Sequence, residues 1–230
     1  MLNTFPFLNI ILPAALSAIG IFSFSFALWK KLKEDYEVDQ IFYLTLLILF
    51  GGGTGLFVSS FFLGDTFSFW GLFLGALLFG VYAVLKLNMR FFEVVDGAVL
   101  GLLLFLSLFS VGNIVKWGLG IQLANLLEFI IILTSLGSYY IFFKKYRTLS
   151  WYISGKIGFV GLAALTVYFL ERALVAFYLF LVLLFPQSFL YGFASLILSL
   201  LFAGIIYLRS GREGAKEILS LLQKYGKSKK

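Results

Sequence analysis

The chain has 230 residues, of which 61% are hydrophobic, 20% aromatic and only 13% charged. Soluble domains usually carry about a quarter charged residues, so this composition excludes an ordinary water-soluble protein and predicts an integral membrane protein. The formal net charge is +7, and the chain contains neither cysteine nor histidine. Disulfides and thiolate chemistry are therefore excluded, and the commonest metal ligand is missing. We expect no metal and no cofactor.

Apolar stretches long enough to cross a bilayer, about 20 residues, recur seven times. They lie near 7–29, 41–63, 69–87, 94–115, 122–143, 157–184 and 189–208. The first stretch lacks the basic region of a cleaved signal peptide, so we expect it to remain as a span. The sixth is overlong and contains Glu171 and Arg172, which leaves open whether it is tilted, kinked or ends as a surface segment. The expected fold class is an all-α integral membrane protein with seven transmembrane helices.

The lysines and arginines outside the spans predict the orientation. Sixteen of them lie in loops 30–40, 86–92 and 144–156 and in the tail from 209, whereas only Lys116 lies in the loops on the opposite side. Short loops that are rich in Lys and Arg stay in the cytoplasm. We therefore expect the N-terminus outside and the C-terminus in the cytoplasm.

The chain divides into a membrane domain, 1–209, and a basic tail, 210–230. The apolar residues of the tail fall on one helical face with lysines around them: Ile218, Leu219, Leu221, Leu222 and Tyr225. This pattern predicts a C-terminal amphipathic helix that lies on the anionic inner leaflet. A nucleic-acid-binding arm is the weaker alternative, because the tail is short and its apolar face is well formed.

Glycines recur at helical spacing in two neighbouring spans, in GGGTG at 51–55 and GLFLG at 71–75. Glycines four residues apart let two helix backbones touch, so the second and third spans are expected to be in close contact. The alternative is that Gly71 and Gly75 form the floor of a lipid pocket.

A few polar residues lie within the spans. Arg172 is costly at this depth and normally faces a partner or a wet cavity. It either binds a lipid phosphate through its planar guanidinium or pairs with an acid on another helix. Glu171 points about 100° away around the helix, so it is not the expected partner. Glu128 could pair with Arg172 or with Lys116.

Two acidic residues, Glu93 and Asp96, lie at the start of the fourth span, where negative charge interacts favourably with the helix dipole. We expect them to cap this helix. Asn113 comes near the other end of the same span and after a glycine, which is typical of a helix stop. The sequence contains no G-x-S-x-G, H-E-x-x-H or P-loop motif, so no residue is assigned a catalytic or metal-binding role.

The run FWGLFLGALLFGVYAVLKLNMRFFEVVDGAVLGLLLFLSLFSVGNIV resembles the central part of the prolipoprotein diacylglyceryl transferases. That family carries an H-G-G-x-x-G-G run, a basic cytoplasmic turn, an aspartate and then G-R-x-G-N. Asp96 falls 26 residues after Trp70, and Asn113 falls 17 after Asp96, which matches the family spacing. Downstream, Gln122-Leu123 resembles part of H-P-T-Q-L-Y-E, and Tyr168 and Arg172 match the Y-x-x-x-R-F-x-x-E helix.

The family transfers a diacylglyceryl group from phosphatidylglycerol to a prolipoprotein cysteine, and this chain departs from it where that chemistry takes place. Trp70 replaces the histidine of the glycine run, and Ser110 replaces the arginine of G-R-x-G-N. The other departures are Phe57 for a second arginine, Ala176 for a glutamate, the missing histidine of the H-P-T-Q-L-Y-E segment, and a head segment shortened to 114–121. Tryptophan cannot accept a proton, and losing acid–base help typically costs about 10²–10⁴-fold in rate.

The resemblance therefore implies a divergent, catalytically inactive relative in the bacterial cytoplasmic membrane. It would bind phospholipid through Arg172, Asn113, Gly71, Gly75 and Tyr168. One alternative is an active transferase in lipoprotein biosynthesis, with phosphatidylglycerol and a prolipoprotein signal segment as its partners. Another is an unrelated transporter or a structural partner in a membrane complex, because seven spans host many functions.

Overall fold

The computed structural model describes residues 6–63, 69–117, 123–150, 152, 154–183, 186–218 and 220. Its elements are α1 (Pro6–Leu32), α2 (Val38–Leu63), α3 (Phe69–Lys86), α4 (Phe91–Trp117), α5 (Leu123–Lys145), the 3₁₀ turn η1 (Tyr146–Thr148), α6 (Phe159–Leu183) and α7 (Pro186–Arg209). A short helical segment, 213–218, follows α7. These described ranges contain no β-strand.

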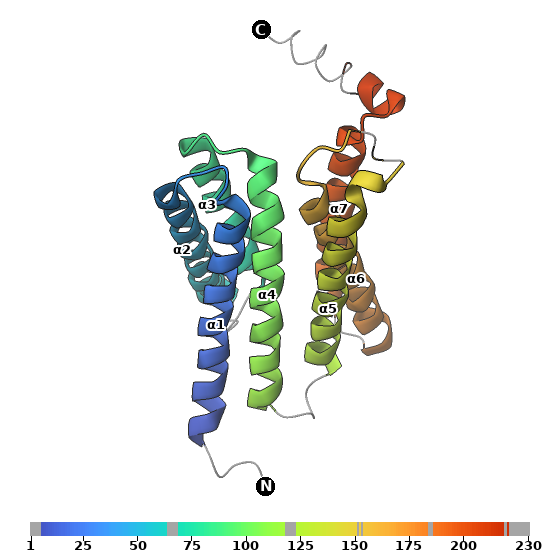
Figure 1. Ribbon diagram of the computed structural model, residues 1–230. Coiled ribbons are helices and arrows are strands. Elements are labelled where there is room, and N and C mark those ends of the chain that lie inside the picture. Colours follow the sequence, from blue (N-terminus) through green and yellow to red (C-terminus); the bar gives the residue numbers. More distant parts are fainter. Residues whose placement is uncertain are drawn as a thin grey trace.

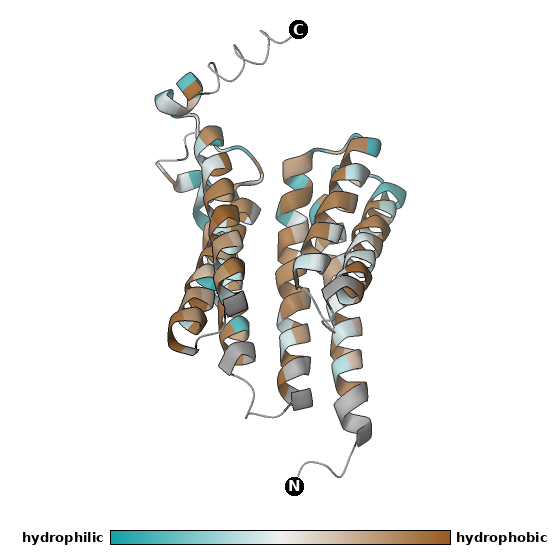
Figure 2. Ribbon diagram, turned by 180° about the vertical axis from the view of Figure 1, so that it is seen from behind, coloured by the Kyte–Doolittle hydropathy of each residue, from teal (hydrophilic) through white to brown (hydrophobic). Residues whose placement is uncertain are grey.

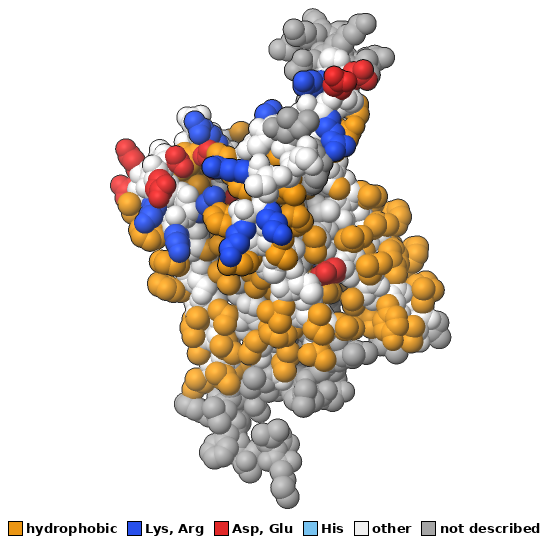
Figure 3. Space-filling view, turned by 45° about the vertical axis from the view of Figure 1, so that its right-hand side comes forward, with side chains coloured by type: hydrophobic (Ala, Val, Ile, Leu, Met, Phe, Trp, Pro, Cys, Tyr) orange, Lys and Arg blue, Asp and Glu red, His pale blue; other side chains and the backbone are white. Residues whose placement is uncertain are grey.

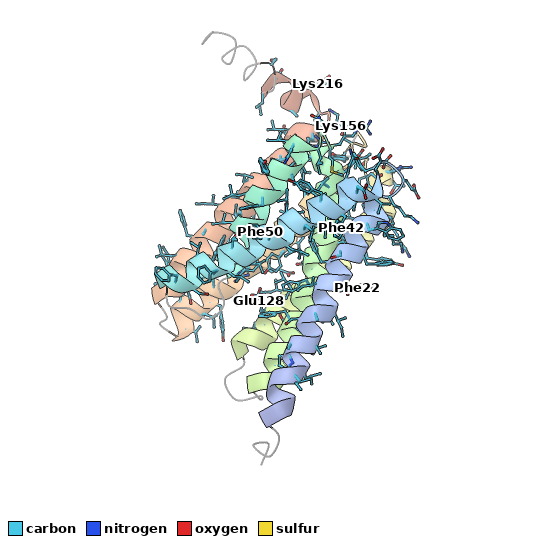
Figure 4. All side chains as sticks on the ribbon, turned by 90° about the vertical axis from the view of Figure 1, so that its left-hand side faces the viewer. Phe22, Phe42, Phe50, Glu128, Lys156 and Lys216 are labelled. Atoms are coloured by element: carbon cyan, nitrogen blue, oxygen red, sulfur yellow. The ribbon has the colours of Figure 1, made fainter. Side chains whose placement is uncertain are left out.

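All seven long helices are long and apolar enough to cross a membrane. Each begins and ends within a few residues of a predicted span, which confirms the seven-helix fold. Hydrophobic residues make up most of each helix (Figure 2), and large apolar side chains such as Phe22, Phe42 and Phe50 are 60–69% exposed on the outside of the bundle (Figure 4). The sixth span, left open by the sequence, is one continuous helix from Phe159 to Leu183.

Basic side chains gather at one end of the bundle, which we call the basic end (Figure 3). Helices α1, α3, α5 and α7 finish there, with lysine or arginine in the last turn of each. Lys156 and Lys216 also lie at this end (Figure 4). Most of the apolar residues that define the predicted amphipathic tail, 219 and 221–230, fall outside the described residues, so that helix stays a prediction.

Helix α4 lies between two groups of helices (Figure 1). It packs against α1 along its length and also contacts α3, α5 and α6, while α2 pairs with α3 and α6 pairs with α7. The buried core accordingly forms two clusters, one among α1, α2, the end of α3 and the start of α4, and the other among α3 to α7.

The contact between α2 and α3 is made by the predicted glycines. An ideal Cβ placed on Gly75 would lie 2.1 Å from the carbonyl oxygen of Gly51, and one on Gly55 would lie 2.0 Å from that of Gly71. Only glycine allows such an approach, so the expected close contact is confirmed. Gly71 and Gly75 thus face α2, which is the helix-packing alternative that the sequence left open.

Asp96 joins three helices at the basic end. Its Oδ2 accepts a hydrogen bond from the Gly158 amide at 3.0 Å, its Oδ1 accepts one from Gly161 at 2.7 Å, and its carbonyl accepts one from the Tyr139 hydroxyl at 3.0 Å. The side chain therefore caps the N-terminus of α6, not of its own helix as the sequence predicts. Gly158 has a φ of +96°, which favours glycine at this turn.

Glu93 holds the loop between α1 and α2 against the start of α4. Its carboxylate accepts hydrogen bonds from the Tyr36 hydroxyl at 2.7 Å and from Arg90 Nη1 at 3.0 Å, and the Tyr36 oxygen accepts one from the Arg90 amide. Burial, together with the hydrogen bond to Glu93, raises the pKa of Tyr36 above its ordinary value. The hydrogen bond to Glu93 likewise raises the pKa of Arg90.

Candidate functional site

Arg172 lies at the centre of a polar cluster inside the bundle. Its Nη1 donates to Glu128 Oε1 at 3.0 Å and to the Tyr168 hydroxyl oxygen at 2.7 Å, and that hydroxyl donates to Glu128 Oε1 at 2.7 Å. The predicted pairing of Glu128 with Arg172 is therefore confirmed, whereas the side chain of the alternative partner, Lys116, lies outside the described residues. The ion pair joins α5 to α6, and Figure 4 places Glu128 well away from the basic end.

The ring of Phe69, the first residue of α3, covers the guanidinium. The Arg172 Cζ lies 3.9 Å from its centroid, a cation–π geometry, which strengthens when water is excluded. Phe69 in turn contacts the rings of Trp70, Phe73 and Phe169 at 5.8–6.2 Å between centroids. We call Arg172, Glu128, Tyr168 and Phe69 the Arg172 cluster.

The depth of Arg172 explains why it needs these partners. It lies thirteen residues after Phe159 in a 25-residue helix, or about 20 Å along its axis, near the middle of the span. An unpaired guanidinium at this depth is strongly unfavourable. Glu128 neutralises the charge, Tyr168 is 1% exposed, and only 20% of the Arg172 side chain remains exposed.

Hydrogen-bond donors outnumber acceptors around this cluster. Both bonds that Arg172 makes to the described residues start at Nη1, which leaves the N–H groups of Nη2 and Nε outside the pairing. The Trp70 Nε1 is buried and has no acceptor in the described part of the chain. Buried donors are nearly always paired, so this indole N–H is a donor that an acceptor beside the cluster would satisfy.

A cavity of about 410 Å³ lies among α3, α4, α6 and α7, within the usual size range of ligand pockets. Every residue that lines it is apolar. Leu74, Leu77 and Leu201 line it and are 42–49% exposed, so it opens to the surrounding membrane between α3 and α7. Phe73 connects it to the Arg172 cluster, because it lines the cavity and stacks on Phe69. From there the cavity extends towards Phe91 at the basic end.

The structure brings together only part of the predicted site. Arg172 and Tyr168 meet, but Gly71 and Gly75 pack against α2 and are not among the residues that line the cavity. Asn113 lies in α4, and its side chain is outside the described residues.

The residues that differ from the family motif lie in different parts of the structure. Trp70 lies against the Arg172 cluster and Ser110 is buried in α4, whereas Phe57 is 74% exposed on the outside of α2. Sequence reasoning also missed Phe69 and Phe73. Two aromatic residues at a spacing of four on one helix face were the available signal for an aromatic cluster.

These features define a multi-pass membrane protein with a neutralised arginine inside its bundle and an apolar cavity beside it. Comparison with protein-family models, curated proteins and solved structures finds no match to this chain. The resemblance to the prolipoprotein diacylglyceryl transferases therefore rests on the sequence motifs alone.

Proposed function

We propose that the protein binds a phospholipid between its helices, as a catalytically inactive relative of the prolipoprotein diacylglyceryl transferases in the bacterial cytoplasmic membrane. In this proposal the basic end faces the cytoplasm, as the distribution of lysine and arginine predicts. The lipid would enter from the bilayer between α3 and α7, where the cavity is open.

One observation carries the proposal: a cluster rich in donors is joined to a wholly apolar cavity through Phe69 and Phe73. A phospholipid has the matching chemistry, because its phosphate and ester oxygens only accept hydrogen bonds and its acyl chains are apolar. The remaining N–H groups of Arg172 and the unpaired Trp70 Nε1 would bind those oxygens, and an acyl chain would fill the cavity.

The side chains of the Arg172 cluster and of the neighbouring Trp70 argue against transferase chemistry. The Trp70 indole is a donor only, and arginine does not lose its proton in proteins. The carboxylate of the cluster, Glu128, neutralises the Arg172 guanidinium. A proton taken up by Glu128 would leave Arg172 as an uncompensated charge inside the bundle, which is strongly destabilising.

Native mass spectrometry of the detergent-purified protein tests lipid binding, with phosphatidylglycerol and phosphatidylcholine added separately. Ala98→Phe places a ring in the cavity, and Trp70→Phe removes the indole donor while it keeps an aromatic ring, so both should reduce the bound lipid. Leu85→Phe is the matched control, because Leu85 is 72% exposed on α3 and does not line the cavity. Equal lipid retention by all these variants would contradict the proposal.

Transferase activity is tested by incubating the protein with phosphatidylglycerol and a peptide that carries a lipoprotein cysteine motif. We expect no lipidated peptide above the level seen with control membranes. A product that disappears in Arg172→Lys would replace the proposal with the active transferase. If neither lipid binding nor a product is observed, the transporter or structural-partner alternative is favoured.

A further inference from the structure

A second charged residue lies at the centre of α6. Glu171 has twelve residues of the helix on either side, between Phe159 and Leu183, so its carboxylate is at the middle of the span. Ionisable groups at this depth are costly and mark functional sites by default. Glu171 points about 100° away from Arg172 around the helix, so it is not part of the Arg172 cluster.

Few partners satisfy this carboxylate. Thr134 of α5 donates a hydrogen bond to Glu171 Oε2 on the exposed surface, but the same hydroxyl also lies 2.9 Å from the carbonyl oxygen of Ile131. A threonine has one hydrogen to donate, whereas a carboxylate can accept about four bonds. The ion pairs among the described side chains are Arg90–Glu93 and Arg172–Glu128, so Glu171 has no cationic partner there.

The surface beside Glu171 is suited to a close approach by another helix. Gly137, one turn after Thr134 on α5, is exposed, and a Cβ placed on it would meet nothing within 4 Å. Leu174 nearby on α6 is 62% exposed. Figure 3 shows acidic side-chain atoms at the surface of the apolar belt. We call Glu171, Thr134, Gly137 and Leu174 the Glu171 face.

We propose that the Glu171 face docks a transmembrane helix of a partner protein that carries a basic side chain near the middle of the membrane. Charge complementarity selects this occupant, because a basic side chain supplies the counter-charge that Glu171 lacks. Small and polar residues are the usual contacts between membrane helices. A second copy of the chain docking through the same face would bring two carboxylates together, and the mid-membrane arginine of this chain, Arg172, is already paired with Glu128.

Binding of synthetic transmembrane peptides to the full chain in phosphatidylcholine nanodiscs tests this proposal. The peptides are polyleucine helices of about 20 residues with lysine, glutamine or leucine at the centre. The chain has no cysteine, so Lys145→Cys provides a single labelling site at the end of α5 for energy transfer to a labelled peptide. We expect the lysine peptide to bind about tenfold more tightly than the leucine peptide.

Two substitutions separate docking from a general structural effect. Glu171→Gln keeps the size of the side chain and should bring the lysine peptide to the affinity of the leucine peptide. Gly137→Leu should block the lysine peptide, whereas Gly53→Leu should not, although Gly53 is likewise exposed on α2 with nothing within 4 Å of its Cβ. Thermal unfolding of each variant confirms that it is folded.

Three results would overturn the proposal. They are equal affinity for the three peptides, lysine-peptide binding that survives Glu171→Gln, and self-association of the chain that depends on Glu171. The last would assign the face to a second copy. The lipid-binding variants Ala98→Phe and Trp70→Phe lie outside the Glu171 face, so the two proposals can fail separately.

Discussion

Replacing Gly75 with alanine should separate α2 from α3. The added methyl group would lie 2.1 Å from the Gly51 carbonyl oxygen, 3.0 Å from the Gly51 carbonyl carbon and 3.0 Å from the Gly55 Cα. All three atoms belong to helix backbone, so no side chain can rotate away. Ordinary contacts of a Cβ begin at 3.4 Å, so the backbones must move apart by more than 1 Å.

Two opposing effects set the size of the change. Alanine is favoured over glycine in a helix by about 1 kcal/mol, whereas overpacking costs about 1–3 kcal/mol and most where nothing can yield. The clash at Gly75 involves rigid backbone, so the upper end of that range applies. We expect Gly75→Ala to lower the free energy of unfolding by about 2 kcal/mol.

Reversible unfolding in mixed detergent and dodecyl sulfate micelles, followed by tryptophan fluorescence, measures this difference. Gly53→Ala is the matched control on α2, because a Cβ there meets nothing within 4 Å. It should leave stability unchanged or raise it by up to about 1 kcal/mol. If Gly75→Ala is as stable as Gly53→Ala, the two helices do not pack through these glycines, and the reasoning is refuted.

Three further predictions use the same unfolding measurement. Arg172→Met should lower stability by about 3 kcal/mol, the lower end of the range for a buried pair, because it leaves the Glu128 carboxylate, whose side chain is 30% exposed, without its counter-charge inside the bundle. The double variant with Glu128→Met should recover most of that loss; an additive double variant would contradict the ion pair. Asp96→Ala removes the cap of α6 and should lower the free energy of unfolding by about 2 kcal/mol. Asp96→Asn should lower it less, because one acceptor oxygen remains. Folding raises the pKa of Tyr36, so the stability that its neutral phenol provides is present below its ordinary pKa of about 10 and is lost as the pH rises through the folded value. Tyr36→Phe should therefore be less stable than the wild type near neutral pH, and the difference should shrink in alkali; a constant difference would exclude this role.

The sequence identifies several individual residues of the candidate site, but it does not predict how they are arranged in space. The sequence marks Arg172 as unusual and narrows its partner to an acid or a lipid phosphate, because a charge within a span must be compensated. The structure shows that Glu128 is the acidic partner. It also shows that Phe69 covers the guanidinium and that Phe73 leads to the cavity. These contacts depend on where α3 begins relative to α6, which no local pattern specifies.

The sequence by itself determines the seven spans and the contact between α2 and α3. A span must be a long apolar stretch whose backbone hydrogen bonds are internal, and this is a local property. The glycines of 51–55 and 71–75 likewise predict that each of these helices lies close to another helix. The predicted bounds of the spans agree with the helices to within a few residues, and the predicted contact is present.

Only the tertiary structure decides how each helix is rotated within the bundle. It turns Gly71 and Gly75 towards α2 and away from the cavity, and it brings Asp96 to the start of α6. The reason is that lipid tails are as apolar as the protein core. A helix that is apolar on every side therefore carries no pattern that distinguishes its buried face from its lipid-facing one.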